Sequence, residues 1–267
     1  MTKLNFNLDY ANSLKLILPE EKTIGLSLVG CGGTGSWLAP AVCRVGKLLQ
    51  ERFHKEVCIR FFDPDTVEEK NIYRQNFCAA EIGRNKSETL AQRFGLAWGI
   101  EINAVPEKFD HPEWDDLTLV IGCVDNADAR RMINNSIGNR GWWLDSGNEK
   151  NSGQILLGSH RGLVNKRIFD LDGFCGWLPA PDLQHPELVQ EEDLKADIEE
   201  NLSCAEIAMQ DSQGLAINQR MAAEAADYLV RMLITKDLRK FATYIDLESG
   251  STRSKYITQK EIGRWLK

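Results

Sequence analysis

IGLSLVGCGGTGS, residues 24–36, is the stretch that decides the fold. An apolar run ends in a loop with four glycines in six residues, and a helical pattern begins directly after it. Glycine permits the tight turn and lets backbone N–H groups at a helix N-terminus approach a phosphate. Gly30, Gly32, Gly33 and Gly35 are therefore predicted to bind a nucleotide. The spacing G-x-G-x-x-G occurs in dinucleotide-binding enzymes as well as in users of nucleoside triphosphates, so it leaves the nucleotide open.

Strand and helix patterns alternate outward from this loop. Near-continuous apolar runs are typical of parallel strands that are covered on both faces. The expected strands are 24–29, 57–62, 117–124 and 142–145, and the expected helices are 35–49, 85–99 and 127–138. This order predicts an α/β fold with a doubly wound, Rossmann-like, mainly parallel sheet. Ligands of such sheets bind beyond the carboxyl ends of the strands.

The second half of the chain has a different character. A further strand is expected at 153–159, and the polar, acidic stretch 160–212 is interpreted as a crossover loop region. A long helix is expected at 213–234, and the runs 241–249 and 253–259 indicate a C-terminal antiparallel hairpin. We expect a single domain over residues 1–267, with its nucleotide-binding core at 20–160 and its C-terminal helix and hairpin at 213–267.

Composition narrows the classes of function. The formal charge of −7 and the pI near 5.3 argue against a protein whose main task is to bind nucleic acid. No apolar run approaches the ~20 residues that cross a bilayer, and the N-terminus lacks the pattern of a signal peptide, so we expect a cytoplasmic protein without a membrane partner. None of the seven cysteines forms a C-x-x-C pair, so no structural zinc is expected.

Acidic residues follow two of the expected strands. Asp63 ends the second strand, where a carboxylate accepts hydrogen bonds from ribose hydroxyls, and Asp65 is either a ligand-binding or a turn residue beside Pro64. Asp125 follows the third strand and is well placed to hold Mg²⁺. Asn126 is expected to cap the next helix. Arg130, one turn into that helix, is expected either to pair with Asp125 or to support the loop.

The segment 68–86, EEKNIYRQNFCAAEIGRNK, separates the classes of nucleotide. It concentrates Asn71, Arg74, Gln75 and Lys86 after the second strand. Arginine offers a planar fork to phosphate oxygens and lysine offers a point charge, as a triphosphate site requires. A dehydrogenase does not need this concentration of phosphate-directed groups. Each residue alone also fits a solvated loop, so the interpretation rests on the four together.

These motifs together resemble the ThiF/MoeB/HesA adenylating enzymes, which are related to ubiquitin-activating enzymes. The matching elements, in family order, are GCGGTGS (30–36), DPD (63–65), NIYRQNF (71–77), IGRNK (82–86) and DNADAR (125–130). The resemblance implies that Gly32 and Gly33 cradle the phosphates of ATP and that Asp63 holds the ribose. It also implies that Asn71, Arg74, Gln75 and Lys86 contact the triphosphate, with Arg74 and Lys86 in catalytic roles, and that Asp125 binds Mg²⁺.

The function implied by the resemblance is ATP-dependent adenylation of the C-terminal glycine carboxylate of a small ubiquitin-like protein, followed in many members by transfer to a cysteine or to an acceptor protein of the conjugating type. A homodimer is expected on the same ground. Many members supply an arginine from an N-terminal segment, and residues 1–43 contain none. The chain also resembles plasmid-type ThiF proteins of the PRTRC system. The alternatives are an NAD-dependent oxidoreductase and a catalytically silent scaffold that binds a ubiquitin-like protein.

Two cysteines are candidates for a thioester. Cys204 closes the polar stretch before the long helix, where family members often carry such a cysteine, and a thiolate near a helix N-terminus is stabilised by the helix dipole. The acidic neighbours Glu199, Glu200 and Glu206 oppose that effect. Cys175, on a glycine-flanked loop, is the rival candidate. An inert, partly buried role for Cys204 is equally compatible with the sequence.

Overall fold

The computed structural model describes residues 9–111, 115–137, 141–159, 168–169, 171–190 and 204–266, without the side chains of residues 204–213 and 215. The strands are β1 Lys15–Leu16, β2 Thr23–Val29, β3 Glu56–Phe62, β4 Asn103–Val105, β5 Leu117–Gly122, β6 Gly141–Asn148, β7 Ser152–Ser159, β8 Phe174–Cys175, β9 Lys240–Asp246 and β10 Ser251–Tyr256. The α-helices are α1 Gly33–Phe53, α2 Lys86–Trp98, α3 Ala127–Ile137, α4 Pro181–Gln184, α5 Cys204–Leu229 and α6 Gln259–Gly263. Short helical turns are η1 Glu69–Asn71, η2 Ala79–Glu81, η4 Pro186–Val189 and the π-helical η5 Val230–Ile234.

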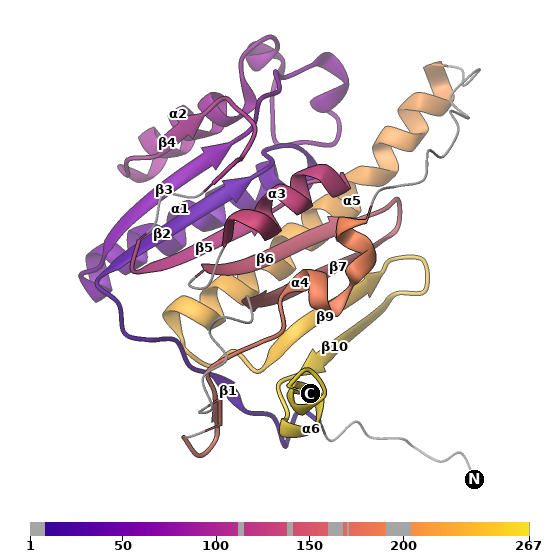
Figure 1. The fold of residues 1–267 in the computed structure, drawn as a ribbon. Coiled ribbons are helices and arrows are strands. Elements are labelled where there is room, and N and C mark those ends of the chain that lie inside the picture. The colour runs from indigo at the N-terminus through magenta and orange to yellow at the C-terminus, as the bar shows by residue number, and fades with distance from the viewer. Residues whose placement is uncertain are drawn as a thin grey trace.

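Within these residues, the main sheet has eight strands in the order β10-β9-β7-β6-β5-β2-β3-β4 (Figure 1). The central strand β2 pairs in parallel with β3 on one side and with β5 on the other. Its side chains are buried on both faces of the sheet, as the continuous apolar run predicts. The glycine loop therefore follows a strand that lies between two parallel strands, β3 and β5. The predicted doubly wound, mainly parallel fold is confirmed.

The other edge of the sheet is antiparallel. β7 pairs antiparallel with both β6 and β9, and β10 completes a hairpin with β9. Gly250 lies in the hairpin turn with a φ of +66°. β10 ends at Tyr256, three residues before the predicted end, because Thr258 caps α6 by accepting a hydrogen bond from the Glu261 N–H. The C-terminal antiparallel hairpin is therefore present, and a short helix follows it.

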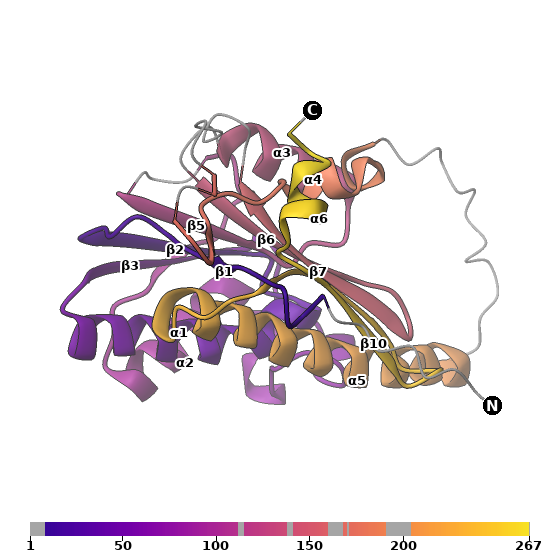
Figure 2. The same ribbon diagram turned by 90° about the horizontal axis from the view of Figure 1, so that it is seen from below.

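Helices cover both faces of the sheet (Figure 2). α1, α2 and α5 lie on one face, and α3, α4 and α6 lie on the other. α1 and α5 pack against each other as well as against the sheet. Their shared core includes Leu38, Val42, Met221 and Ala225, all of them fully buried. In the described part of the chain, no helix combines the length and the apolar character needed to cross a membrane.

Several elements differ from the expectation. α5 begins at Cys204 rather than at residue 213, so the stretch 160–212 is not wholly a loop, and it also contains β8, α4 and η4. Residues 160–167, 170 and 191–203 of the expected crossover region lie outside the described residues. The strands β1, β4 and β8 were not predicted because segments of two or three residues are too short to show a periodic pattern.

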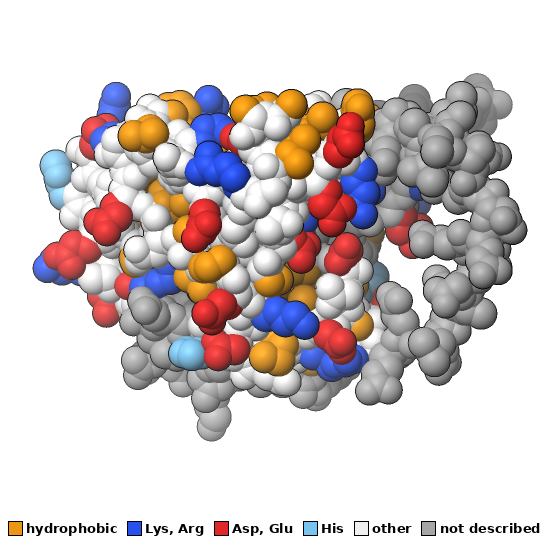
Figure 3. Space-filling model, turned by 90° about the horizontal axis from the view of Figure 1, so that it is seen from above, with side chains coloured by type: hydrophobic (Ala, Val, Ile, Leu, Met, Phe, Trp, Pro, Cys, Tyr) orange, Lys and Arg blue, Asp and Glu red, His pale blue; other side chains and the backbone are white. Residues whose placement is uncertain are grey.

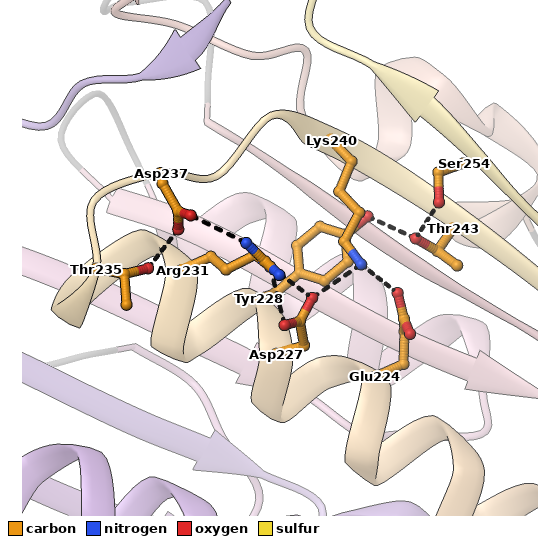
Figure 4. Close-up of polar contacts among 9 residues, drawn as sticks. All are labelled: Glu224, Asp227, Tyr228, Arg231, Thr235, Asp237, Lys240, Thr243 and Ser254. Carbon is orange, nitrogen blue, oxygen red and sulfur yellow. Dashed lines mark hydrogen bonds and ion pairs between the residues drawn. The ribbon is translucent and has the colours of Figure 1, made fainter. Parts of the chain in front are cut away.

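A polar network fixes the C-terminal part of α5 to β9 (Figure 4). The Lys240 Nζ lies 2.6 Å from Glu224 Oε1 and 2.9 Å from Asp227 Oδ2. Asp227 also pairs with Arg231, which pairs in turn with Asp237. Both carboxylates on the helix thus meet one lysine on the neighbouring strand. Hydrogen bonds between oppositely charged groups are stronger than those between neutral groups. The network therefore holds the helix and the strand in one relative position.

Acidic and basic side chains are interspersed among the coloured residues on the face drawn in Figure 3, and no continuous basic stripe runs across them. A face of mixed sign produces no strong field of one sign that would attract a polyanion.

Candidate active site

A cavity of about 1510 Å³ opens at the carboxyl ends of β2, β3, β5 and β6. It exceeds the roughly 300–1,000 Å³ that is common for small-molecule sites, so it has room for a nucleotide and part of a second ligand. The predicted site residues that line it are Gly30, Gly32, Gly33, Asp63, Asp65, Asn71, Arg74, Gln75, Lys86 and Asp125. Of the other two, Gly35 lies in the first turn of α1 and packs against Gly30 rather than lining the cavity. The side chain of Cys204 is outside the described part of the chain. The sheet thus brings together residues from four strand ends.

The glycine loop turns directly from β2 into α1. Gly32 is the N-cap residue of α1, and no side chain in the described part of the chain caps this helix, so its first N–H groups have no partner there within the helix or from a cap. Gly32, Gly33 and Thr34 line the cavity at this helix end. Gly35 is required for packing, because a Cβ there would lie 1.9 Å from the carbonyl oxygen of Gly30. The loop therefore presents free N–H donors and partial positive charge to a bound anion.

Gly35→Ala is expected to destabilise the protein by roughly 1–3 kcal/mol, because the new methyl group meets backbone that cannot move independently. Gly32→Ala is the matched control, since a Cβ there would lie 3.7 Å from the Gln75 Nε2, an ordinary contact. Urea unfolding of both variants measures the difference. Equal stability of the two would contradict this account of the loop.

Asp63 is buried at the end of β3 and is held by two backbone donors. Its Oδ2 accepts a hydrogen bond from the Cys31 N–H at 2.6 Å, and its Oδ1 accepts one from the Asp65 N–H at 2.9 Å. Burial raises the pKa of Asp63, and these two hydrogen bonds oppose the rise. A carboxylate has about four acceptor sites, so further hydrogen bonds from ribose hydroxyls remain feasible at this cavity-lining position.

Lys86 is a nearly buried cation in the cavity wall. It is the first residue of α2, and its Nζ lies 3.0 Å from the Oδ2 of the more exposed Asp65. Asn85 fixes the approach of the two segments, because its side chain donates to the carbonyl oxygens of Asp63 and Asp65. It also caps α2 by accepting the Glu88 N–H. The DPD turn and the start of α2 are thereby held together, and this role of Asn85 was not predicted.

The remaining polar residues of segment 68–86 serve both structure and the cavity. Asn71 is buried and accepts a hydrogen bond from the Glu68 N–H at 2.9 Å, which forms the capping box of η1. Trp37 donates from its indole nitrogen to the backbone oxygen of Arg74 at 3.2 Å. The side-chain oxygen of Gln75 is buried and has no partner among the described protein groups. A buried polar atom of this kind in a cavity wall is a contact point for a ligand or its water.

Asp125 projects into the cavity from the loop after β5. It is exposed, and its Oδ1 lies 3.2 Å from the Asn126 Nδ2. Asn126 caps α3 as predicted, because its Oδ1 accepts the Ala129 N–H at 2.9 Å. In the described residues, no three His, Cys, Asp or Glu side chains form a group that could hold a metal ion by themselves. A single carboxylate is compatible with Mg²⁺, which keeps several waters and shares substrate phosphates.

Arg130 supports this loop from below and does not pair with Asp125. Its Nη2 donates to the Val124 carbonyl oxygen at 2.8 Å, and its Nε lies 3.2 Å from the Oδ1 of Asp145 on β6. Of the two roles predicted for Arg130, loop support is found and the ion pair with Asp125 is wrong. Asp145 is fully buried, and burial raises its pKa while Arg130 opposes the rise.

Two walls of the cavity were not predicted. One is apolar and includes Phe109, whose ring packs edge-on against Phe62 with 5.0 Å between the ring centroids. The other is polar and includes Asn148 at the end of β6 and Asn218 on α5. An apolar wall beside phosphate-directed groups suits the base of a nucleotide.

The two candidate thioester cysteines have different surroundings. Cys175 is buried, its Sγ lies 3.0 Å from the Trp177 carbonyl oxygen, and burial raises the pKa of its thiol to about 11. A thiol with so high a pKa is a poor nucleophile near neutral pH. Cys204 is the first residue of α5, and its side chain lies outside the described residues.

Comparison with known proteins identifies related sequences and folds. The sequence model of the ThiF family matches residues 22–164. Ubiquitin-like modifier-activating enzyme 5 of Dictyostelium discoideum is 32% identical over 161 residues, which are 51% of this chain and 39% of that protein. The enzyme of the same name from Rattus norvegicus is 30% identical over 158 residues, covering 51% of this chain and 36% of the other.

Solved structures with this fold include the microcin C7 biosynthetic enzyme MccB in complex with N-formylated MccA. It superposes with a TM-score of 0.57 at 15% identity, over 88% of this chain and 64% of MccB. PaaA superposes with a TM-score of 0.52 at 16% identity, over 87% of this chain and 64% of PaaA. The chain thus spans less than two fifths of the two curated relatives and less than two thirds of these structures.

Proposed function

Because the chain belongs to the ThiF family, we propose that it activates a carboxylate by adenylation with ATP, and that the carboxylate is the C-terminal glycine of a ubiquitin-like protein. The observation that carries this proposal is the meeting of the glycine loop, Lys86 and Arg74 with Asp125 around one cavity. The relatives named ubiquitin-like modifier-activating enzyme 5 support a ubiquitin-like substrate.

In the proposed reaction a carboxylate oxygen attacks the α-phosphorus of ATP. The bond from that phosphorus to the oxygen that bridges the α- and β-phosphates breaks, and pyrophosphate leaves with the electron pair. The product is an acyl-adenylate, and no group on the chain becomes covalently bound in this step. The chain therefore contributes by positioning the reactants and by neutralising charge.

Each cavity residue has a role in this scheme. The N–H groups at Gly32 and Gly33 hold phosphate oxygens, and Asp63 accepts from the ribose. Lys86 and Arg74 neutralise the charge that develops on the phosphates as pyrophosphate departs. Asn71 and Gln75 add polar contacts. The Asp65 carboxylate, 3.0 Å from the Lys86 Nζ, keeps this ammonium group directed into the site.

Mg²⁺, when bound, would neutralise phosphate charge and help to orient the phosphates for displacement. Asp125 is the residue that would hold it, because it is an exposed carboxylate on the cavity wall with one amide contact. Arg130 fixes the loop that carries Asp125 through the Val124 carbonyl oxygen.

Asp125→Ala is expected to lower the Mg·ATP-dependent adenylation rate by at least about 100-fold, a loss comparable to that of one preorganised charge-stabilising group. Its free energy of unfolding should change by less than about 0.5 kcal/mol, because the side chain is exposed. ATP–pyrophosphate exchange and urea unfolding measure the two effects. An exchange rate equal to that of wild type would exclude Asp125 from the reaction.

ATP–pyrophosphate exchange in the presence of a ubiquitin-like protein that ends in glycine tests the proposed function. We expect exchange that requires Mg·ATP and that is lost when the substrate's C-terminal glycine is removed. Thermal stabilisation by NAD but not by Mg·ATP would indicate an oxidoreductase. Stabilisation by the ubiquitin-like protein without exchange would indicate a scaffold, and exchange with a short peptide alone would indicate a peptide substrate.

We further propose that Cys204 accepts the acyl group as a thioester, because it begins α5 whereas Cys175 is buried with a raised thiol pKa. The Cys204 sulfur attacks the carbonyl carbon of the acyl-adenylate, the bond from that carbon to the phosphate oxygen breaks, and AMP leaves with the electron pair. The adduct should form with Cys175→Ala and be cleaved by excess thiol. This thiol-sensitive adduct should be absent with Cys204→Ala. A thiol-sensitive adduct that survives in Cys204→Ala and disappears in Cys175→Ala would reverse the assignment.

The partners proposed with this activity are the ubiquitin-like substrate, an acceptor protein of the conjugating type and a second copy of the chain. Light scattering of the purified protein measures the last of these directly. A monomer at all concentrations used for the exchange reaction would exclude the homodimer.

A further inference from the structure

A polar cluster joins α5 to three other parts of the candidate site. The Thr34 hydroxyl, at the start of α1, donates to the Asn148 Oδ1 at 2.9 Å and lies 3.4 Å from the Asn218 Oδ1. The Asn148 Nδ2 donates to the Asn218 Oδ1 at 3.2 Å. The Asn218 Nδ2 lies 3.4 Å from the backbone oxygen of Arg74. One amide on α5 therefore contacts the glycine loop, the end of β6 and the segment that carries Arg74.

The surroundings of Asn218 leave little freedom for its side chain. It is 6% exposed, and a Cβ on Gly33 would lie 2.8 Å from its Oδ1. One turn earlier on α5, Gly214 places no side chain between the helix and Arg74, where a Cβ would be 3.9 Å from the Arg74 Cδ. α5 thus approaches both the glycine loop and Arg74 closely. An alanine at Gly33 would therefore meet the Asn218 side chain, whereas an alanine at Gly214 would make only ordinary contacts.

α5 is itself held in place. The Lys240 network fixes its C-terminal part to β9 (Figure 4), and α5 also packs on α1. Helix and sheet therefore carry Asn218 to a set position, as a positioning group requires. The sequence model of the family ends at residue 164, so this contact comes from the part of the chain beyond the matched segment.

We propose that Asn218 is a positioning residue for adenylation, which aligns the first turn of α1 and the main chain of Arg74 toward the phosphates. This inference rests on the proposed function. Asn218 orders two phosphate-directed groups at once, through Thr34 and through the Arg74 carbonyl oxygen. A displacement of about 1 Å in such groups can cost on the order of 100-fold in rate.

The test compares Asn218→Ala with Gln219→Ala, an exposed neighbour on the same helix. Asn218→Ala is expected to lower the kcat of ATP–pyrophosphate exchange by roughly 10- to 100-fold at saturating substrate, while Gln219→Ala retains the wild-type rate. Asn218→Asp keeps the acceptor for Thr34 and Asn148 and loses the donor to Arg74, so it should fall between wild type and Asn218→Ala in the stability of the free protein. A folded Asn218→Ala protein with wild-type kcat and KM would overturn the inference.

A double-mutant cycle with Thr34→Val separates positioning from general destabilisation. If the two side chains act through their shared contacts, the loss in kcat for the double variant is smaller than the product of the single losses. Thr34→Val combined with Gln219→Ala should show independent effects. Fully multiplicative losses for Thr34→Val and Asn218→Ala would contradict the proposal. Absence of exchange in the wild-type protein would instead refute the proposed function, and the same cycle measured on unfolding free energies would still report whether the two side chains are coupled.

Discussion

Lys86→Met is expected to lower the rate of ATP–pyrophosphate exchange by about 100- to 1,000-fold, the usual effect of removing one preorganised charge-stabilising group. The fold should tolerate the change. Lys86 is the first residue of α2, where a cation opposes the helix dipole, so its charge does not help this helix. Its partner Asp65 has a side chain that is 67% exposed and stays solvated without the lysine. A positive charge at a helix N-terminus is unfavourable for the helix, but at this position it faces the cavity.

Lys22→Met is the matched control for this variant. Lys22 lies just before β2, at the opposite end of the strand from the glycine loop, and its partner Glu56 is also exposed. Lys22→Met removes the same charge from the chain as Lys86→Met does. An exposed ion pair contributes only about 0–1 kcal/mol to stability. Exchange by Lys22→Met should match wild type. If both variants lost activity equally, the effect would come from net charge rather than from the position of Lys86.

Arg130→Met is expected to destabilise the protein by about 3–5 kcal/mol near neutral pH, because it leaves Asp145 buried without its cation. Arg131→Met is the control on the same helix. Arg131 pairs with Asp128, whose side chain is 80% exposed, so its loss should cost less than about 1 kcal/mol. Urea unfolding of both variants gives the comparison. Equal losses would mean that the buried pair has no special weight.

The loss of unfolding free energy caused by Arg130→Met should also depend on pH. Burial already raises the pKa of Asp145, and without Arg130 this pKa rises further. The folded variant then keeps a proton on Asp145 at pH values where folded wild type has lost it, so stability relative to wild type falls as the pH rises above the already raised wild-type pKa of Asp145. The deficit should therefore be smaller at about pH 5 than at about pH 8. A deficit that grows as the pH falls would contradict this assignment.

The parallel half of the fold was predictable because its signals are local. Continuous apolar runs indicated the buried strands. The helical pattern at 85–99 matches α2 to within one residue at each end, where Asn85 and the left-handed Gly99 turn out to be the cap residues. The start of α5 was missed because residues 160–212 were interpreted as one crossover region, although residues 204–209, CAEIAM, are mostly apolar and already belong to the helix. β4 was missed because three residues give no period.

The candidate site was predictable where its residues follow strand ends in a short motif. Asp63, Lys86 and Asp125 all line the cavity, and their roles remain predictions. Asn218 was missed because 184 residues separate it from Thr34, and a single asparagine on a long helix has no distinctive spacing. Asp145 was read only as the last residue of an apolar strand. Its pairing with Arg130 depends on the sheet order, which places β6 beside β5.

The N-terminal segment has a consequence for how the chain is made. The Leu14 N–H donates to the Ile257 carbonyl oxygen at 2.7 Å, and the Leu16 N–H donates to that of Leu238 at 2.8 Å. Residues 14–16 are thus synthesised long before their partners at 238 and 257, and contacts so distant in sequence form slowly. The nucleotide loop, whose neighbours in β3 and β5 are complete by Gly122, does not wait. Biosynthesis would therefore assemble the phosphate-binding half first and attach residues 14–16 only after residue 257 has been translated.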